Sequence, residues 1–434
     1  MRKVCIAFFI VMGLLLWQTP QAQAQFWKKI FKKEKKNTKS NRQDGQTKKE
    51  QEVKTVLKEQ VMPQFPGSEK KEVYRIDLLL PLNLNNLVVN DQAVQAKVPE
   101  SVLPYVQFYE GMLLAADTLA AMGRKINVHV HDIRDPSSSI RNITQTNSTM
   151  KNTDLIIGVV QSNEIPAVAD FSKQHKVNFL SALSPSDAGV RNNPYFILVQ
   201  PTLNTHLHQM IRYALKQYPS EPKVLLYDLK NSGEREAYEQ LTNALADEKD
   251  IKPLDLSKST VDSAGLAQLM DPHSLNVVFI SVLQTDRAEQ ILKSLALLTP
   301  KFKIEVFGLP SWKSIRGLNV PGYYGDLGIN YTTPFHYNRE SPRGTAIRSA
   351  YTERFGGTPS EMVLRGYESL YWMAHLLNRY GPVFNTEMER IGERSFTNYD
   401  IQASWSDQND FLYFENRQLY IFRYQQGKRQ VKNP

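Results

Sequence analysis

The chain has 434 residues, of which 41% are hydrophobic and 10% aromatic, enough for two compact lobes plus extensions. Its net charge of +9 arises in the first 72 residues, which hold 16 basic and 7 acidic side chains, whereas the remainder holds 37 of each. This neutral remainder argues against a nucleic-acid-binding surface, which would need clustered lysines and arginines.

The first 24 residues have the organisation of an export signal. Arg2 and Lys3 precede an apolar run of 14 residues, Val4 to Trp17, which is shorter than the roughly 20 residues that span a membrane. Ala22-Gln23-Ala24 then supplies the small residues of a cleavage site. We predict cleavage near Ala24 and delivery to the periplasm or cell envelope. An uncleaved N-terminus is the alternative, because the lysines that follow oppose translocation.

Residues 25–72 are rich in Lys, Gln, Glu and Asn, which predicts a disordered basic linker. Its first part, Phe26 to Lys36, combines aromatic residues with six lysines. On a helix the apolar side chains would share one side, an arrangement suited to peripheral contact with an anionic membrane. The alternative is a solvated tail, because the apolar stripe is shorter than two turns.

From Val73 onward, apolar runs and helical spacing alternate along the chain. The first series predicts strands at 76–80, 126–131, 155–160 and 177–180, and helices at 105–120, 140–150 and 164–175. The second series predicts helices at 203–218, 234–247, 262–270 and 286–298, and strands at 223–227, 251–254, 277–281, 304–307 and 322–331. Such alternation is typical of parallel sheets covered by helices, and two series predict two lobes.

The last hundred residues complete this domain organisation. Two further helices are predicted at 342–355 and 360–379. We expect lobe one to contain 73–200 plus 332–383, and lobe two to contain 201–331 plus 384–434. Near the C-terminus, 410–414 and 418–423 alternate about Glu415-Asn416-Arg417, which predicts a β-hairpin.

Four stretches carry a family pattern through their order and spacing. They are Tyr109 to Ala116, then Asp154 to Ser162 with Pro166 and Phe179 to Ser184, then Tyr195 to Pro201, and last Tyr351 to Gly357 together with Gly366-Tyr367-Glu368. The pattern resembles the type 1 periplasmic-binding-protein fold family, which includes amino-acid-type solute-binding proteins and receptor ligand-binding domains. The resemblance covers about residues 73–424. It implies an α/β protein with two doubly wound parallel-sheet lobes joined by a multi-crossover hinge.

The resemblance also implies a ligand between the lobes, at the carboxyl ends of both sheets, where open α/β sheets present loops and helix N-termini. Backbone amides and hydroxyls at a helix N-terminus can hold a carboxylate. In lobe one we expect such helices to begin near Glu164 and Ser186. By position, the candidate ligand-binding residues are Ser162, Asn163, Ser184 and Ser186 in lobe one, and Asp228, Gln284, Ser311 and Trp312 in lobe two.

The lobe-two loops depart from the pattern of amino-acid binders in this family. A Tyr-Gly pair usually follows the position of Asp228, where this chain has Leu229 to Gly233. An acidic residue for the ligand ammonium often follows the strand ending at Gly308, where this chain has Pro310-Ser311-Trp312. The candidate serines could equally be helix caps, and Trp312 could be a packing residue.

No motif for catalysis or for cofactor binding is present, including Gly-x-Ser-x-Gly, the Walker loop and His-Glu-x-x-His. We interpret His129 and His131 as structural or solvent-facing, so no metal and no cofactor is predicted. The sequence favours a non-enzymatic protein that binds a small polar, amino-acid-like solute. The alternative is an envelope scaffold or regulator of the same fold that binds a protein or cell-wall partner, like the activators of penicillin-binding proteins.

Overall fold

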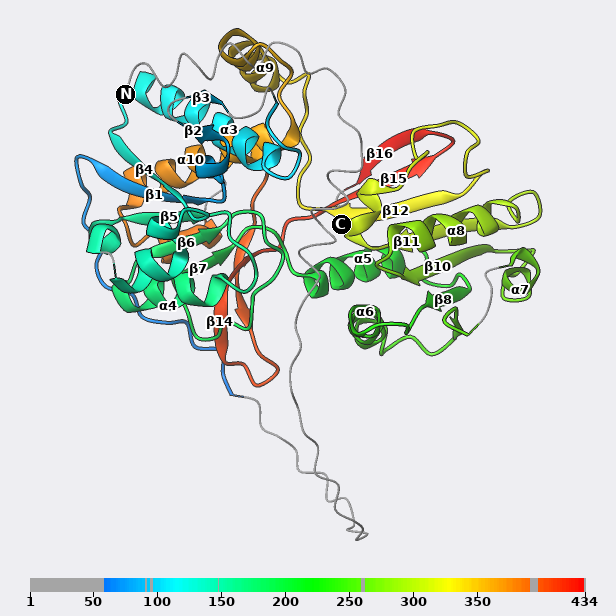
Figure 1. Ribbon diagram of the computed structural model, residues 1–434. Helices are drawn as coiled ribbons and strands as arrows, with labels where there is room; N and C mark the ends of the chain where they lie inside the picture. The colour runs from blue at the N-terminus through cyan, green and yellow to red at the C-terminus, as the bar shows by residue number, and fades with distance from the viewer. Residues whose placement is uncertain are drawn as a thin grey trace.

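The computed structural model describes residues 58–89, 92–93, 97–146, 148–258, 262–390 and 397–432. The predicted signal peptide and the segment from Phe26 to Lys36 lie outside these residues. The described chain forms two lobes, and each is built around a seven-stranded sheet flanked by helices (Figure 1). This confirms the two-lobed α/β fold.

The sheet of lobe one has the strand order β13-β14-β7-β6-β5-β1-β4. All neighbours are parallel except β13, which runs antiparallel to β14. Its strands are β1 (Tyr74–Leu80), β4 (Ile126–Asp132), β5 (Leu155–Gly158), β6 (Asn178–Ser181), β7 (Phe196–Leu198), β13 (Ile401–Trp405) and β14 (Phe411–Asn416). Its α-helices are α3 (Leu103–Ala121), α4 (Ile165–His175), α9 (Pro342–Phe355) and α10 (Glu361–Tyr380).

Shorter elements complete lobe one. They are β2 (Val88–Val89), β3 (Gln92–Ala93), η1 (Leu84–Asn86), η2 (Pro136–Ser138), η3 (Asn142–Thr146), η4 (Ser148–Asn152) and η6 (Asn385–Arg390). The elements η3 and η4 replace the continuous helix predicted over 140–150. The two faces of the sheet are covered differently, with α3 and α10 over one apolar cluster and α4 over another.

Two glycines let α3 and α10 pack closely. A Cβ atom built on Gly111 of α3 would lie 1.8 Å from the carbonyl oxygen of Val363, and one built on Gly366 of α10 would lie 1.8 Å from that of Phe108. Any side chain at either position would push the helices apart. The backbones therefore touch at this crossing, which explains why glycine stands in both family-like stretches.

The sheet of lobe two has the order β16-β15-β12-β11-β10-β8-β9. Its strands are β8 (Lys223–Tyr227), β9 (Ile251–Asp255), β10 (Leu275–Ser281), β11 (Lys303–Gly308), β12 (Gly328–Thr333), β15 (Tyr420–Gln425) and β16 (Lys428–Lys432). The helices are α5 (Leu203–Gln217), α6 (Ser232–Ala244), α7 (Ser263–Ala267), α8 (Thr285–Ala296) and η5 (Pro310–Ser314). The strand predicted over 322–331 begins only at Gly328, because turns occupy the residues before it.

The described chain crosses between the sheets three times, after β7, after β12 and after β14. The third crossing shows that the predicted hairpin around Glu415-Asn416-Arg417 is wrong. Strand β14 pairs with β7 and β13 in lobe one, whereas β15 pairs with β12 and β16 in lobe two. The expectation that 384–434 belongs wholly to lobe two is therefore wrong for β13 and β14.

Residues 58–72 also differ from the predicted linker, because they lie along lobe one. The Phe65 ring contacts Tyr195 and Phe414 at centroid distances of 6.0 and 6.5 Å. The Ser68 hydroxyl accepts a hydrogen bond of 3.0 Å from the backbone N–H of Val383. The boundary at residue 72 is too late, since the chain is already held by lobe one from Lys58 onward.

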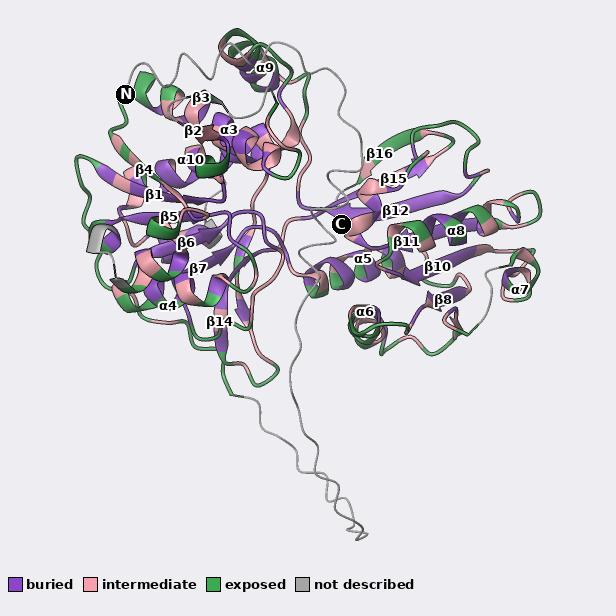
Figure 2. Ribbon diagram, viewed as in Figure 1, coloured by how far each residue is buried: buried purple, intermediate pink, exposed green. Residues whose placement is uncertain are grey.

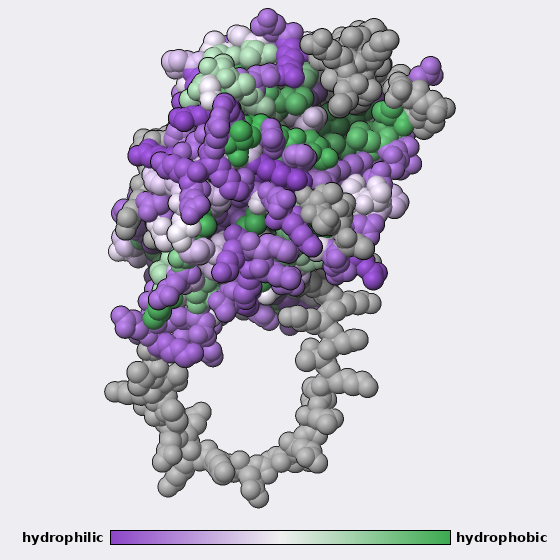
Figure 3. Space-filling view, turned by 90° about the vertical axis from the view of Figure 1, so that its left-hand side faces the viewer, coloured by the Kyte–Doolittle hydropathy of each residue, from purple (hydrophilic) through white to green (hydrophobic). Residues whose placement is uncertain are grey.

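Burial follows the layered arrangement of each lobe. Figure 2 shows the central strands of both sheets buried beneath helices whose outer surfaces are exposed. Figure 3 shows a face of the molecule that is largely hydrophilic around a band of hydrophobic residues. Among the described residues, the helices are all too short or too polar to cross a membrane.

Candidate functional site

The loop between β5 and α4 carries the first pair of predicted residues. The Ser162 side chain is partly buried, Asn163 is exposed, and neither makes a side-chain hydrogen bond to a residue that the structure describes. Ser162 therefore does not cap α4. Instead, Glu164 stands at the helix start, and its carboxylate accepts a 2.8 Å hydrogen bond from the backbone N–H of Gln161.

Arg134, which follows β4, completes this loop. Its two terminal nitrogens donate to the two carboxylate oxygens of Glu164 at 2.9 and 3.0 Å. The backbone N–H of Arg134 in turn donates to Asp132. Such a bidentate pair is strong and fixes both side chains. Neither Arg134 nor the role of Glu164 was predicted from the sequence, although a carboxylate near a helix N-terminus is a recognisable signal.

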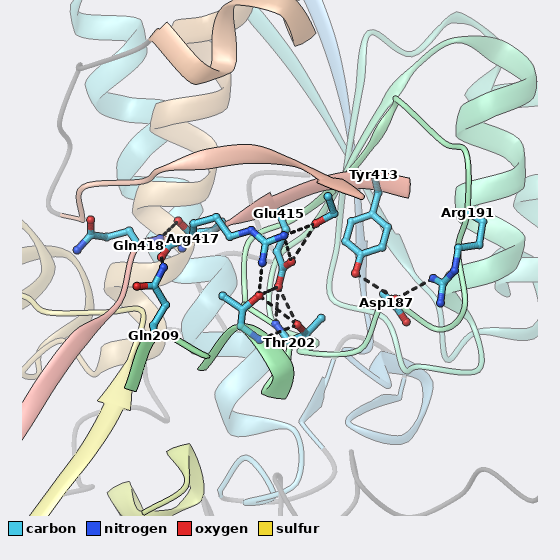
Figure 4. Close-up of polar contacts among 11 residues, drawn as sticks. Asp187, Arg191, Thr202, Gln209, Tyr413, Glu415, Arg417 and Gln418 are labelled. Carbon is cyan, nitrogen blue, oxygen red and sulfur yellow. Dashed lines mark hydrogen bonds and ion pairs between the residues drawn. The ribbon is translucent and has the colours of Figure 1, made fainter. Parts of the chain in front are cut away.

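Ser184 and Ser186 lie after β6 and stabilise their own loop. The Ser184 hydroxyl accepts from the backbone N–H of Ser186 at 3.3 Å, and the Ser186 hydroxyl accepts from that of Ala188 at 3.1 Å. No helix follows in this loop, so the expectation of one near Ser186 is wrong. Asp187 anchors the same loop by accepting a 3.0 Å hydrogen bond from the Tyr413 hydroxyl (Figure 4).

Asp228 follows β8 in lobe two and is buried. Its carboxylate accepts a 2.9 Å hydrogen bond from the backbone N–H of Lys230 and lies 3.8 Å from the Nε of Arg287. The side chain therefore orders its own loop, and Arg287 balances its charge.

Gln284 precedes α8, and a carboxylate from another helix binds its backbone. Glu234 of α6, which is buried, accepts hydrogen bonds of 2.8 and 3.1 Å from the backbone N–H groups of Leu283 and Gln284. Burial raises the pKa of Glu234, although these two hydrogen bonds favour its charged form. Glu234 was not predicted from the sequence, because it lies 49 residues from Leu283 in the chain.

The last predicted pair lies in η5. Trp312 is fully buried, and its indole packs directly on Gly308, where a Cβ atom would lie 2.2 Å from the ring. In this structure Trp312 packs in the core of lobe two, as expected of a packing residue, and its role in ligand binding stays a prediction. The Ser311 hydroxyl lies buried without a hydrogen-bond partner among the described residues.

Lys313, next to Trp312, forms an ion pair between the lobes with Glu361, the first residue of α10. Glu361 also pairs with Arg365 one turn later, and Arg365 lies 3.8 Å from the ring centroid of Phe335 in the second crossover. Burial alone would raise the pKa of Glu361, but Arg365 and Lys313 lower it to about 2. The two cations therefore keep this carboxylate charged.

Glu415, at the end of β14, organises the hinge (Figure 4). Its carboxylate accepts hydrogen bonds from the Thr202 N–H at 2.8 Å, the Thr202 hydroxyl at 2.9 Å and the Thr205 hydroxyl at 2.8 Å. It also accepts from Ser404 at 3.1 Å and pairs with Arg417 at 3.2 Å. Thr202 caps α5, so one buried carboxylate joins the last strand of lobe one to the first helix of lobe two.

The histidine pair of β4 is divided between surface and interior. His129 is exposed, whereas the Nε2 of His131 lies 2.6 Å from Asp77 on β1. Asp77 is fully buried and also accepts two hydrogen bonds from Arg75. No group of three or more His, Cys, Asp or Glu side chains suited to a metal is found in the part of the chain described.

A shallow surface pocket lies elsewhere in lobe two. It is formed by the loop before β12 and the turn between β15 and β16, with Leu318, Tyr324 and Gln425 among its lining residues. None of the eight predicted residues lines it. The eight residues lie instead on the loops at the carboxyl ends of β5, β6, β8, β10 and β11.

Two α/β lobes, joined by three crossovers and carrying polar loops at the carboxyl ends of their strands, define a two-lobed binding protein. The sequence model of the family described as periplasmic binding protein matches residues 107–391. The chain belongs to this family, which is one of binding proteins. A search of curated proteins finds no significant match.

Solved structures share the fold at low sequence identity. An ABC transporter substrate-binding protein from Desulfitobacterium hafniense, in complex with Leu, is 16% identical with a TM-score of 0.52, covering 83% of this chain and 100% of its own. A branched-chain amino acid ABC transporter periplasmic ligand-binding protein from Burkholderia xenovorans is 15% identical with a TM-score of 0.55, covering 83% and 94%. A Sphaerobacter thermophilus ABC transporter substrate-binding protein is 16% identical with a TM-score of 0.51, covering 83% and 96%.

Proposed function

We propose that this chain is an exported, non-enzymatic binding protein that takes a small polar solute between its two lobes. The observation that carries the proposal is a pair of polar side chains, on the loop after β5 of lobe one, without hydrogen-bond partners among the described residues. Ser162 and Asn163 present a hydroxyl and an amide that make no side-chain hydrogen bond within the described residues, at the carboxyl end of a buried strand. Membership of the periplasmic binding protein family supports the same function.

The similar protein from Desulfitobacterium hafniense is in complex with Leu, which makes an amino-acid-like solute the first ligand to test. The lobe-two loops of this chain give little support to a bound ammonium group. Trp312 is buried, and the side chain beside it, Lys313, is itself a cation. We therefore propose a polar solute held mainly by uncharged side chains of both lobes.

We further propose that the protein acts in the periplasm or cell envelope after cleavage near Ala24, with Phe26 to Lys36 contacting an anionic membrane surface. Binding to vesicles that contain phosphatidylglycerol should weaken as salt is added, because screening weakens attraction between surface charges. Replacing the six lysines of Phe26 to Lys36 by Gln should abolish it. Binding that is independent of salt would contradict this proposal.

One observation favours the alternative, an envelope scaffold that binds a protein or cell-wall partner. The ion pair of Lys313 with Glu361 joins the lobes beside the carboxyl end of β11. An ion pair here stabilises one arrangement of the lobes without any solute, as a scaffold requires. A scaffold would bind its partner equally well when the candidate ligand residues are changed.

Native mass spectrometry of protein purified without refolding tests the main proposal, because a solute that copurifies appears as added mass. Ser162→Ala should then weaken binding of that solute about two- to tenfold, since one hydrogen bond contributes about 0.5–1.5 kcal/mol. Ser349→Ala, on the exposed face of α9, is the matched control and should change nothing. A chain that carries no solute, yet retains an envelope partner, would favour the scaffold.

A further inference from the structure

The two lobes repeat one arrangement of strands. The order β4-β1-β5-β6-β7 in lobe one corresponds to β9-β8-β10-β11-β12 in lobe two. Strands β5 and β10 are therefore equivalent, and so are the helices α4 and α8 that follow them. The loop between strand and helix shares one feature in both lobes: a glutamate of this chain accepts a hydrogen bond from one backbone N–H of the loop in lobe one and from two in lobe two.

In lobe one this glutamate is Glu164. Its carboxylate accepts hydrogen bonds from the backbone N–H of Gln161 at 2.8 Å and from both terminal nitrogens of Arg134 at 2.9 and 3.0 Å. Only 15% of the Glu164 side chain is exposed, against 30% of Arg134, so the pair is largely shielded from water. Backbone N–H groups near a helix start, together with a guanidinium fork, are the groups that bind a ligand carboxylate in many proteins.

In lobe two the corresponding glutamate comes from a different element. Glu234 belongs to α6, yet its carboxylate reaches the N–H groups of Leu283 and Gln284 just before α8. Glu234 is 2% exposed, so the interaction is internal to the lobe. A carboxylate thus binds the equivalent loop in both lobes, but it comes from the start of the following helix in lobe one and from a different helix in lobe two.

We propose that Glu164 is a specificity-determining residue that excludes carboxylate-bearing solutes from lobe one and restricts the site to neutral, hydroxyl- or amide-bearing solutes. This inference rests on the proposed function. A ligand carboxylate at this loop would meet the negative charge of Glu164 and would find Gln161 N–H and Arg134 already engaged. In lobe two, Glu234 likewise occupies the backbone N–H groups of Leu283 and Gln284.

The side chains that remain uncommitted fit a neutral ligand. Ser162 and Asn163 in lobe one, and Ser311 and Gln284 in lobe two, offer hydroxyl and amide groups that donate and accept hydrogen bonds without charge. Neutral hydrogen bonds of this kind suit the hydroxyls of a sugar or the amides of a peptide. A solute found by native mass spectrometry should therefore carry no free carboxylate.

Glu164→Ala tests the inference directly, with L-leucine as the carboxylate-bearing probe and isothermal titration calorimetry as the measurement. The substitution frees Gln161 N–H and the Arg134 fork, so the variant should bind L-leucine at least tenfold more tightly than the unmodified chain. Asp170→Ala is the matched control, because it removes one exposed carboxylate from α4 without touching the loop. It should leave L-leucine binding unchanged.

Amide hydrogen exchange supplies a second measurement that needs no ligand. The Gln161 amide should exchange slowly in the unmodified chain and faster in Glu164→Ala, and Glu164→Gln should be intermediate because its carbonyl can still accept. The inference is overturned if the unmodified chain binds L-leucine as tightly as the variant, or if neither binds it while circular dichroism shows both folded. Absence of any copurified solute would instead contradict the proposed function. The gain of L-leucine binding in Glu164→Ala is measured independently of that result.

Discussion

Replacing Glu415 is the sharpest test of how the hinge is held. The carboxylate is 2% exposed and accepts four hydrogen bonds, from Thr202 N–H and the hydroxyls of Thr202, Thr205 and Ser404, besides pairing with Arg417. Glu415→Ala removes the acceptor that these groups share, although Arg417 still donates to the hydroxyls of Thr205 and Ser404. Removing one partner of a buried pair costs about 3–5 kcal/mol, and we expect the lower end because Arg417 is 27% exposed and can reach water.

Urea denaturation at neutral pH, followed by circular dichroism, measures this loss. Glu415→Gln keeps one carbonyl acceptor, so it should lose about half as much stability as Glu415→Ala. Glu353→Ala removes an exposed acid from α9 and should stay within about 0.5 kcal/mol of the unmodified chain. If Glu415→Ala unfolds at the same urea concentration as this control, the network does not stabilise the hinge and the reasoning fails.

Three further predictions concern packing, pH and the contact between the lobes. Gly366→Ala should destabilise the protein by about 3 kcal/mol in the same assay, because its Cβ would overlap the backbone of α3. Burial raises the pKa of Glu110 from 4.5 to about 7, so between these pH values the folded protein keeps this proton while the unfolded chain releases it. The free energy of unfolding should therefore fall as the pH rises from 4.5 to 7, and it should fall less in Glu110→Gln. Thermal melts across this pH range measure the difference. Lys313→Met should widen the distribution of distances between spin labels on the two lobes, and an unchanged distribution would show that its ion pair with Glu361 does not hold them.

Much of the fold could be predicted because its signals are local. The helix over 342–355 was predicted with the same bounds as α9, since a serine cap precedes it and a glycine with positive φ ends it. The pairing of strands depends on residues that are far apart in the sequence. The alternating residues around Glu415 suit a hairpin, but β14 pairs with β7, which precedes it by more than 200 residues. Alternation identifies a strand without naming its neighbour.

The candidate site was only partly predictable for a similar reason. The sequence indicates where the strands end and therefore which loops follow them, and Ser162 and Gln284 lie on such loops. It does not indicate which side chain binds a given backbone N–H, since Glu234 reaches Leu283 only through the packing of α6 against the sheet. Polar composition likewise predicts a linker up to residue 72, but the ring contacts of Phe65 and the hydrogen bonds of Lys58 and Ser68 hold this segment on lobe one.

The contacts between the lobes differ in how far hinge motion would disturb them. The Glu415 network lies at the crossovers themselves, where rotation displaces atoms least, and it is buried. The ion pair of Lys313 with Glu361 joins η5 to the start of α10, and both side chains are 31% exposed. An ion pair with that exposure contributes about 1 kcal/mol, a fivefold shift in an equilibrium between two arrangements. A solute or partner that interacts with either charge can therefore change the arrangement of the lobes at small cost, while the hinge network keeps them joined.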